Sequence, residues 1–508
     1  YILGNFLNTQ LNKMRDNGQT EEWKKRCDRG AMESQALETI YKNSKIPEAE
    51  RKDAKKHLTK VRLQLKSDME ILNSLLTQKV QFVWKSLYFY MNTLIFTNSH
   101  DDDVLDKFCG LWFEYDGDDS INVLLRKEVG IVPSWKFLPW VNQIASKLST
   151  DNTEFQKTLQ LTMKRLLFKL PYESVYSVLS IKLYSKYTTT FASGIAQRIK
   201  AVERILKDLE GYENGKYYNQ YVVPLEEFCC KAVDFANMKL SPKMKDSKRI
   251  RFDSLDDGVY WLKRLATVRM PLPTTHVNIS SSNDGKLPRP YIVSVKETAE
   301  VSSTGLSLPK IVTFRISDGS TRRLLMKGSN DDLRQDAIME QVFRQVNKIL
   351  KGDKQMRKLD LNIGTYEVIP LGPRAGIIEY VANSVSLHEI LTILHKKDSV
   401  SFSQARNEMK KVQTKTNIER LATYEEIIKG IKPQLRNFFF DSFLEPKEWL
   451  DAKRSYTKGT AVISVVGHIL GLGDRHLNNI LLDCNSGRPI HIDLGIAFDQ
   501  GRLLPIPE

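Results

Sequence analysis

Four polar residues near the end of the chain have the types and spacing that phosphoryl transfer from a nucleotide requires. Asp474 and Asn479 lie five positions apart, His476 lies between them, and Asp493 follows after a short apolar pattern. In that reaction one carboxylate orients the attacking hydroxyl, while an amide and a second carboxylate hold magnesium on the phosphates. Asp474, Asn479 and Asp493 could fill these three places.

The elements expected around these residues can bring them together. An apolar run with helical spacing ends at Gly471 and Gly473, because glycine breaks a helix and allows a tight loop. Two short apolar runs follow, at residues 480–482 and 490–492, with a polar turn between them. This pattern predicts a two-stranded hairpin that carries Asp493 back beside the loop.

A second polar motif lies in LLMKGSNDDLRQDAIMEQVF, at residues 324–343. Lys327 ends an apolar strand pattern, a polar bend follows, and a helix pattern bearing Asp336 begins. A lysine at this place can offer a positive charge to nucleotide phosphates, and Asp336 could pair with it and fix its position. The chain has no G-x-x-x-x-G-K-[ST] motif, which disfavours an ATPase of the Walker type.

The order of the loop residues carries a family resemblance. The spacing of Asp474 and Asn479 is that of the protein-kinase loop H-R-D-x-x-x-x-N, but here the histidine follows the aspartate, and D-L-G replaces D-F-G. The wording GLGDRHLNNILLD with HIDLGIAFDQGRLLPIPE resembles the phosphatidylinositol-3-kinase-related protein kinases. It is most similar to the ATM type, especially its fungal telomere-maintenance members.

The resemblance implies roles for the site residues. Asp474 would accept the proton of the substrate hydroxyl, His476 would stabilise the transferring phosphate, and Asn479 and Asp493 would bind the metal. The cofactors would be ATP and Mg²⁺, with Mn²⁺ as the alternative ion. The implied nucleotide contacts are Lys327 and Asp336 on the phosphate side, Ser303, Gly305 and Leu308 in a phosphate-covering loop, Tyr366 in an inner pocket, Glu379, Tyr380 and Val381 along the adenine edge, and Leu481 and Ile492 as its floor.

The expected fold class is α+β, with a helical half before a two-lobed kinase domain. Residues 1–250 show helical patterns in series and predict an α-solenoid. Residues 132–150 and 170–181 are similar to the closing helices of the FAT domain of this family. We expect a linker at 251–275, a β-rich small lobe with the hinge at 276–381, and a mainly helical large lobe at 382–508. The large lobe is expected to be incomplete, ending in the activation segment, with a FATC segment to follow.

Bulk composition bounds the class of protein. With 41% hydrophobic and 27% charged residues, the chain is typical of soluble globular proteins. The most apolar stretch, at 80–96, is interrupted by polar residues and predicts a buried helix, so no membrane partner is expected. Five cysteines without C-x-x-C pairs disfavour zinc and disulfide frameworks.

The positive charge of the chain leaves two interpretations open. The net charge of +15 favours an acidic partner such as nucleic acid, unless segments outside this sequence carry the balancing acids. Basic runs lie at 55–66 and 239–251. The second run could contact DNA or serve in nuclear import, although such a run is more often a solvated linker.

The predicted function is that of a serine/threonine protein kinase. The resemblance implies protein substrates with Ser or Thr before Gln, double-strand-break signalling and telomere maintenance in the nucleus, a homodimer formed through helical regions, and recruitment by a complex that senses DNA ends. The alternatives are a phosphoinositide lipid kinase, another branch of the same family, or an inactive scaffold. Only one basic residue, Arg502, lies in 496–508, where lipid kinases tend to have several, and the loop acids that a scaffold would lose are present.

Overall fold

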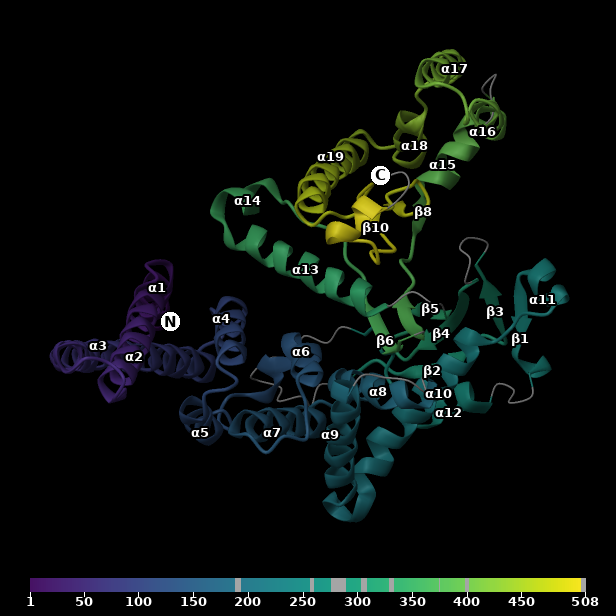
Figure 1. Cartoon of the computed structure of the whole chain (residues 1–508). Coiled ribbons are helices and arrows are strands. Elements are labelled where there is room, and N and C mark those ends of the chain that lie inside the picture. Colours follow the sequence, from purple (N-terminus) through teal and green to yellow (C-terminus); the bar gives the residue numbers. More distant parts are fainter. Residues whose placement is uncertain are drawn as a thin grey trace. The chain divides into compact units, whose positions relative to one another are not determined.

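The computed structural model describes residues 1–187, 193–255, 260–275, 289–302, 308–328, 333–373, 375–397 and 402–503. The chain forms two compact units (Figure 1). The first is built from Tyr1–Ser174 and Ala192–Leu209, and the second from Val175–Phe191, Glu210–Asn278 and Leu287–Glu508. No described helix has the length and apolar character needed to cross a membrane.

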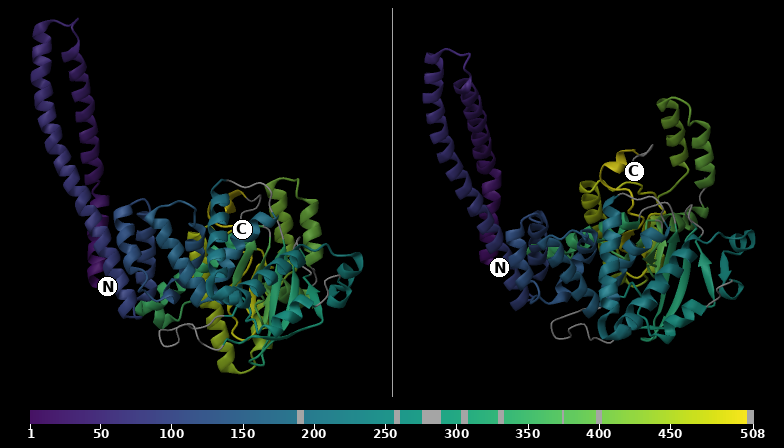
Figure 2. Two further views of the ribbon diagram at one scale, coloured as in Figure 1. Left: turned by 90° about the horizontal axis from the view of Figure 1, so that it is seen from below. Right: turned by 60° about the horizontal axis from the view of Figure 1, so that its bottom comes forward.

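The first unit is helical, as the sequence predicts. Its helices are α1 (Ile2–Asp16), α2 (Gln19–Lys42), α3 (Glu48–Phe96), α4 (Asp101–Glu114), α5 (Asp119–Glu128), α6 (Val141–Ser146), α7 (Glu154–Lys169) and α9 (Ser193–Glu210), with the 3₁₀ helix η1 (Ser134–Trp140). The long helices α2 and α3 lie side by side (Figure 2). The apolar stretch at 80–96 is the last part of α3, where Val83, Leu87 and Leu94 are buried, so this prediction is confirmed.

The second unit begins with helices and continues into a sheet. The helices are α8 (Pro171–Tyr187), which starts in the first unit, η2 (Tyr212–Gly215), η3 (Tyr218–Val222), α10 (Val223–Asn237), α11 (Pro242–Ser247), η4 (Phe252–Ser254) and α12 (Tyr260–Thr267). The strands are β1 (Arg249–Arg251), β2 (Ile292–Val295), β3 (Thr298–Val301), β4 (Lys310–Ile316), β5 (Thr321–Gly328), β6 (Val368–Gly372) and β7 (Ala375–Glu379). The sheet is antiparallel in the order β1-β3-β4-β5-β7-β6, and β2 pairs with β4.

The basic run at 239–251 is not a solvated linker throughout. Its last residues form β1, which pairs with β3 at the edge of the sheet, and Ile250 is completely buried there. The preceding residues form α11, whose first turn is capped by the Ser241 hydroxyl. The arginines on either side of Ile250 face solvent because side chains alternate along a strand.

Helix α10 packs directly on the sheet and belongs to the same unit. The Lys310 ammonium donates to the carbonyls of Ala236 (2.5 Å) and Met238 (3.0 Å), at the C-terminal end of α10. A Cβ on Gly328 would lie 2.6 Å from the Ala236 carbonyl oxygen, so only glycine allows this close approach. The domain boundaries expected at 250, 275 and 381 stay predictions.

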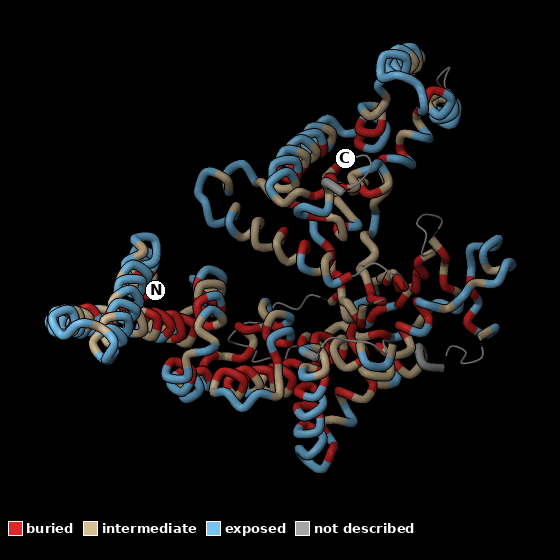
Figure 3. The backbone as a smooth tube through the Cα atoms, viewed as in Figure 1, coloured by how far each residue is buried: buried red, intermediate tan, exposed pale blue. Residues whose placement is uncertain are grey.

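The rest of the second unit is mainly helical around a small sheet. Its elements are α13 (Leu333–Gly352), α14 (Lys354–Leu359), β8 (Ser384–Ser386), α15 (Leu387–Leu394), η5 (His395–Lys397), α16 (Phe402–Lys411), α17 (Asn417–Lys429), α18 (Leu435–Ser442), α19 (Pro446–Ile469), β9 (Ile480–Asp483), β10 (Pro489–His491) and η6 (Phe498–Leu503). The three strands pair in the order β10-β9-β8. Helices α16 and α17 are largely exposed (Figure 3).

One hydrophobic core of this unit joins three segments that are far apart in the sequence. Met339 and Phe343 of α13 pack with Val462 of α19 and with Leu494 and Ala497. The segment that follows Asp493 is therefore anchored between α13 and α19, which places it within reach of the sheet and of the loop after α19.

Candidate functional site

The loop that follows α19 is closed by hydrogen bonds between its own residues. The Asn479 amide nitrogen donates to the backbone carbonyl of Asp474 (3.0 Å) and to its carboxylate (3.4 Å). The Asn479 N–H donates to the His476 carbonyl (2.8 Å). Asn479 is 6% exposed, so its amide is held in one orientation by the loop, while the Asp474 side chain remains 39% exposed.

The predicted hairpin is present and returns Asp493 to this loop. Strands β9 and β10 pair in antiparallel register, and the Ile492 N–H donates to the Asn479 carbonyl (3.0 Å). Asp493 and Asp474 both have φ of 58°, in the left-handed region that non-glycine residues rarely adopt. Such conformations persist where the surroundings hold them, and they are typical of functional sites.

Arg475 supplies the connection that holds the two segments together. Its guanidinium donates to the carbonyls of Gly473 (2.7 Å), Ile492 (2.9 Å) and Asp493 (2.5 Å). Burial lowers the pKa of Arg475 from its ordinary value. No specific role for this residue could be predicted from the sequence, because it binds backbone carbonyls, and these leave no signature in residue types.

The lysine motif meets the hairpin at Asp493. The Lys327 ammonium lies 3.2 Å from the Asp493 carboxylate, although the two residues are 166 positions apart. Lys327 ends β5 with its side chain 11% exposed, whereas the Asp493 side chain is 46% exposed. The lysine is thus fixed at the wall of the site, and the carboxylate is open to a ligand.

Asp336 contacts the same segment from α13. Its carboxylate accepts a hydrogen bond from the Leu494 N–H (2.6 Å), and the residue is 3% exposed. The carboxylate therefore holds the backbone next to Asp493. That Asp336 fixes Lys327, as the sequence predicts, stays a prediction.

Tyr366 lies behind Asp493 in a buried pocket. Burial raises the pKa of its hydroxyl well above the ordinary value, and the nearby Asp493 N–H opposes this shift. Tyr366 packs with Leu333 and Val368, and Val381 and Ile492 lie against this cluster. Three residues expected around the nucleotide, Tyr366, Val381 and Ile492, therefore belong to one apolar wall.

The expected adenine edge continues from β7. Glu379 exchanges two hydrogen bonds with the Glu367 backbone, at 2.8 and 3.0 Å. The Tyr380 N–H donates to the Arg323 carbonyl (3.2 Å), and the Arg323 guanidinium stacks 3.9 Å from the Tyr380 ring. The Val381 carbonyl accepts from the Ser384 hydroxyl (2.8 Å).

The remaining predicted nucleotide contacts lie on either side of this edge. Leu481 is in the middle of the small sheet, opposite Ser386 and Ile490. Leu308 has φ of 44° and is half-buried, next to a backbone hydrogen bond from Ser302 to Pro309 (2.8 Å) that closes the base of the loop. Ser303 and Gly305 lie outside the described residues.

His476 sits at the open side of the loop. Its Nδ1 accepts a hydrogen bond from the Asn478 N–H (3.2 Å), which assigns the proton of the neutral ring to Nε2. Nε2 lies 4.0 Å from the Asp474 carboxylate, and the His476 side chain is 44% exposed. This protonated nitrogen is available to an anionic ligand near Asp474.

The oxygen atoms of Asn479 and Asp493 suit a magnesium ion. The Asn479 nitrogen is engaged with Asp474, which leaves the amide oxygen free of that contact, and the Asp493 carboxylate is half-exposed. Mg²⁺ prefers oxygen ligands and commonly takes one or two from the protein, with the rest from water and phosphate. Among the described residues no group of three or more His, Cys, Asp or Glu side chains is placed to hold one ion.

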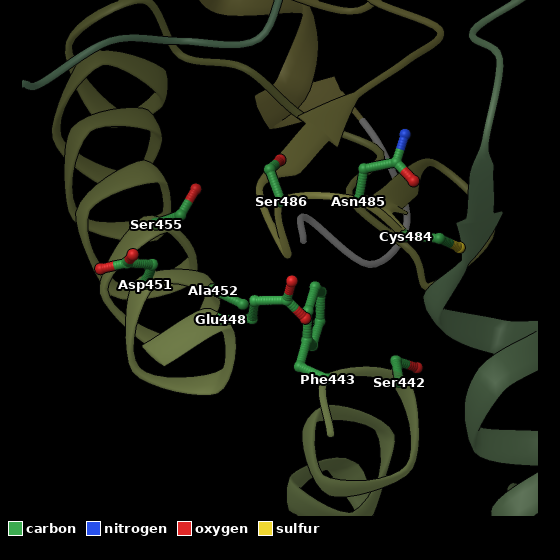
Figure 4. Close-up of a pocket in the computed structure, with 9 residues that line it drawn as sticks. All are labelled: Ser442, Phe443, Glu448, Asp451, Ala452, Ser455, Cys484, Asn485 and Ser486. Carbon is green, nitrogen blue, oxygen red and sulfur yellow. The ribbon is translucent and has the colours of Figure 1, made fainter. Parts of the chain in front are cut away.

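A separate cavity of about 510 Å³ lies between α18, α19 and the β9–β10 turn. Figure 4 shows Asp451 and Ser455 on α19 across from the turn that carries Cys484, Asn485 and Ser486. None of the predicted site residues lines it. The cavity is therefore not the predicted nucleotide site.

Comparison with known proteins shows which proteins this chain is similar to. The family model described as Phosphatidylinositol 3- and 4-kinase matches residues 324–508. The chain is 60% identical over its whole length to the serine/threonine-protein kinase TEL1 of Saccharomyces cerevisiae, and it spans 18% of that protein. It is 50% identical over its whole length to the TEL1 kinase of Kluyveromyces lactis, of which it also spans 18%.

A solved structure agrees along the whole chain. The structure titled "Tel1 kinase butterfly symmetric dimer" is 58% identical, with a TM-score of 0.89, and this chain covers 21% of it. The predicted fold class, helices followed by a kinase domain with a sheet-rich small lobe, is confirmed. Because the motifs, the fold and the identity over all 508 residues agree, the resemblance to the phosphatidylinositol-3-kinase-related protein kinases of the ATM type is confirmed.

Proposed function

We propose that this chain carries the ATP site and the catalytic loop of a magnesium-dependent serine/threonine protein kinase. The observation that supports this most directly is the ion pair of Lys327 with Asp493. This ion pair joins strand β5 to the residue that follows the β9–β10 hairpin. Next to Asp493, the Ile492 N–H bonds the Asn479 carbonyl, and the Asn479 side chain in turn bonds Asp474. The relatives that match the whole chain are named as protein kinases.

In this proposal Asp474 orients the substrate hydroxyl and accepts its proton. His476 donates from Nε2 to the phosphoryl group in transfer, and Lys327 contacts the nucleotide phosphates. Asn479 and Asp493 would hold the magnesium ion, which when bound neutralises charge on the phosphate oxygens. Arg475, Asp336 and Tyr366 keep the Asp493 backbone in place through the contacts described above.

The adenine ring would lie along residues 379–381. Tyr366, Val381, Leu481 and Ile492 would supply apolar contacts, and the loop that contains Ser303, Gly305 and Leu308 would cover the phosphates. Residues 276–381 would then act as the small lobe, and residues 382–508 as part of the large lobe, after the helical residues 1–250.

The finer function follows from the relatives and is also proposed. The substrates would be proteins with Ser or Thr before Gln, in double-strand-break signalling and telomere maintenance in the nucleus. The similar structure is titled as a dimer, which supports a homodimer. We expect the helical regions to form its interface. A complex that senses DNA ends would recruit the kinase.

One experiment tests the activity and its main alternative. The complete protein is incubated with Mg-ATP and three substrates: a Ser-Gln peptide, a matched Ser-Pro peptide, and phosphatidylinositol vesicles. We expect phosphate transfer to the Ser-Gln peptide at least about tenfold faster than to the others. Transfer only to the lipid would establish the phosphoinositide kinase, and no transfer together with no Mg-ATP binding in calorimetry would establish the scaffold.

A further inference from the structure

Glu340 is a buried acid that the proposed mechanism does not use. It lies one helical turn after Asp336 on α13, and it is completely buried. One carboxyl oxygen accepts a hydrogen bond from the Tyr366 N–H (3.1 Å). The other oxygen has no hydrogen-bond partner in the structure.

The charged groups around Glu340 leave it without a cation of its own. Arg344, one turn further along α13, donates to the Tyr366 carbonyl (2.9 Å) and pairs with Glu367 (2.9 Å). The other charged group facing Glu340 from α13 is the carboxylate of Asp336, and Glu367 faces it from the segment before β6. An ionised Glu340 would add a further negative charge to a buried place whose arginine is already engaged.

Burial therefore favours the neutral acid. Desolvation raises the pKa of Glu340 to about 8, against the weaker opposing effects of the Tyr366 N–H and of Arg344. As a neutral acid Glu340 can donate through one oxygen and accept through the other. This form accepts the hydrogen bond of the Tyr366 N–H without placing a further negative charge in the buried site.

Tyr366 links Glu340 to the catalytic centre. Its backbone is held on both sides by α13, with the N–H bonded to Glu340 and the carbonyl bonded to Arg344. Its side chain belongs to the cluster against which Ile492, the residue before Asp493, packs. A shift of Tyr366 would therefore move the carboxylate that pairs with Lys327.

We infer that Glu340 is a positioning residue of the catalytic centre, which aligns Asp493 through Tyr366, and that a negative charge placed here beside the carboxylates of Asp336 and Glu367 disturbs this alignment. The inference rests on the proposed kinase function. Glu340 touches neither nucleotide nor substrate, and it acts only through the tyrosine.

The decisive variant is Glu340→Gln in the complete protein. Glutamine keeps the size of the acid and its pair of donor and acceptor atoms, but it cannot ionise. For the unchanged protein, one ionisation near pH 8 should lower kcat/KM for the Ser-Gln peptide about tenfold at pH 9 relative to pH 7. Glu340→Gln should keep kcat/KM at pH 7 within about twofold and move the alkaline decline up by at least about one pH unit.

Two further variants separate this effect from others. Burial also lowers the pKa of Lys310 to about 8, so the ionisation of this lysine is a second candidate cause of the alkaline decline. If Glu340 is the cause, Lys310→Met should leave the decline in place. Glu340→Ala removes the contact with Tyr366, and it should lower kcat about tenfold while KM for the peptide changes less than about threefold. Mg-ATP binding by calorimetry should weaken from pH 7 to pH 9 in the unchanged protein but not in Glu340→Gln.

Thermal unfolding supplies a readout that does not depend on activity. The folded protein binds the proton of Glu340 more tightly than the unfolded chain does, so stability falls as the pH rises from about 4.5 to about 8. Glu340→Gln should raise Tm at pH 7, and the gain should grow up to about pH 8. If the kinase is active and Glu340→Gln leaves its alkaline decline unchanged, the inference is wrong. It is also wrong if the decline disappears only with Lys310→Met. If the protein has no kinase activity, the proposed function is wrong instead.

Discussion

The two sides of the candidate site differ in how their charged groups are held. On the nucleotide side Lys327, Asp336 and Tyr366 are nearly completely buried, and Tyr366 packs with Leu333 and Val368. On the loop side the side chains of Asp474 and His476 are 39% and 44% exposed, and hydrogen bonds to the backbone keep the loop in place. A buried group is positioned by packing, whereas an exposed group must be positioned by its own backbone.

The difference suits the two tasks that we propose. A nucleotide is bound at the same place in every cycle, so a rigid and partly apolar wall does not hinder turnover. A protein substrate must approach and leave, so the acid that meets it has to stay accessible. Each of the substitutions below alters one side of the site. They differ in whether we expect a loss of turnover alone or also a loss of stability and of nucleotide affinity.

The largest effect should come from Asp474→Ala on the loop side. Removing the acceptor for the substrate proton should lower kcat more than about a thousandfold. Because the side chain is exposed, Tm and Mg-ATP affinity should stay close to those of the unchanged protein. The measurements are single-turnover phosphorylation, thermal unfolding and calorimetry, with Asp441→Ala, an exposed aspartate of α18, as the control. Residual transfer above about a tenth of normal would remove Asp474 from its proposed role.

A smaller but broader effect is expected from Asp336→Ala on the nucleotide side. This change leaves the buried Leu494 N–H without its acceptor, at a cost of about 1–3 kcal/mol. We expect kcat/KM to fall about a hundredfold, with weaker Mg-ATP binding and a lower Tm. Asp336→Asn keeps an acceptor oxygen and should recover part of the loss. If Asp336→Ala kept its affinity for Mg-ATP, the buried side would not depend on this carboxylate.

The smallest effect should come from Arg475→Lys, which keeps the positive charge but loses the planar guanidinium with its several N–H donors. A lysine ammonium cannot reach three carbonyls with the geometry of a guanidinium. We expect kcat to fall about tenfold while Mg-ATP affinity changes less than about threefold, because Lys327 and the apolar wall remain. Arg436→Lys, at an exposed position of α18, is the matched control. Equal losses in kcat and in affinity would show that the loop and the nucleotide wall are not held separately.

Residue types with short separations were sufficient to predict several parts of the site. The five-residue spacing of Asp474 and Asn479 lies within one loop, so the sequence alone indicates that the two meet, and their hydrogen bonds agree. The hairpin that returns Asp493 was predictable from two apolar runs around a polar turn, because a short turn leaves few other arrangements. The roles of these residues in catalysis stay predictions.

Other features depend on contacts between distant segments. Strand β1 lies in a run of basic residues whose composition indicates a linker, and only its pairing with β3 makes it part of the sheet. Asp336 and Glu340 leave a faint signal, since both fall on the buried stripe of a helix with Met339 and Phe343. That spacing could have identified two buried acids, but not their partners.

What the sequence determined by itself is the chemistry available: an acid, a histidine, an amide and a lysine in motifs whose order indicates the family. Tertiary structure alone decided which charge is solvated and which is not. Lys327 faces Asp493, Arg475 binds three carbonyls, and Glu340 is enclosed without a cation because segments distant in sequence pack around them. Residue type sets the ordinary pKa and hydrogen-bonding capacity of a group, but burial and neighbours shift both, and these arise only when the chain folds.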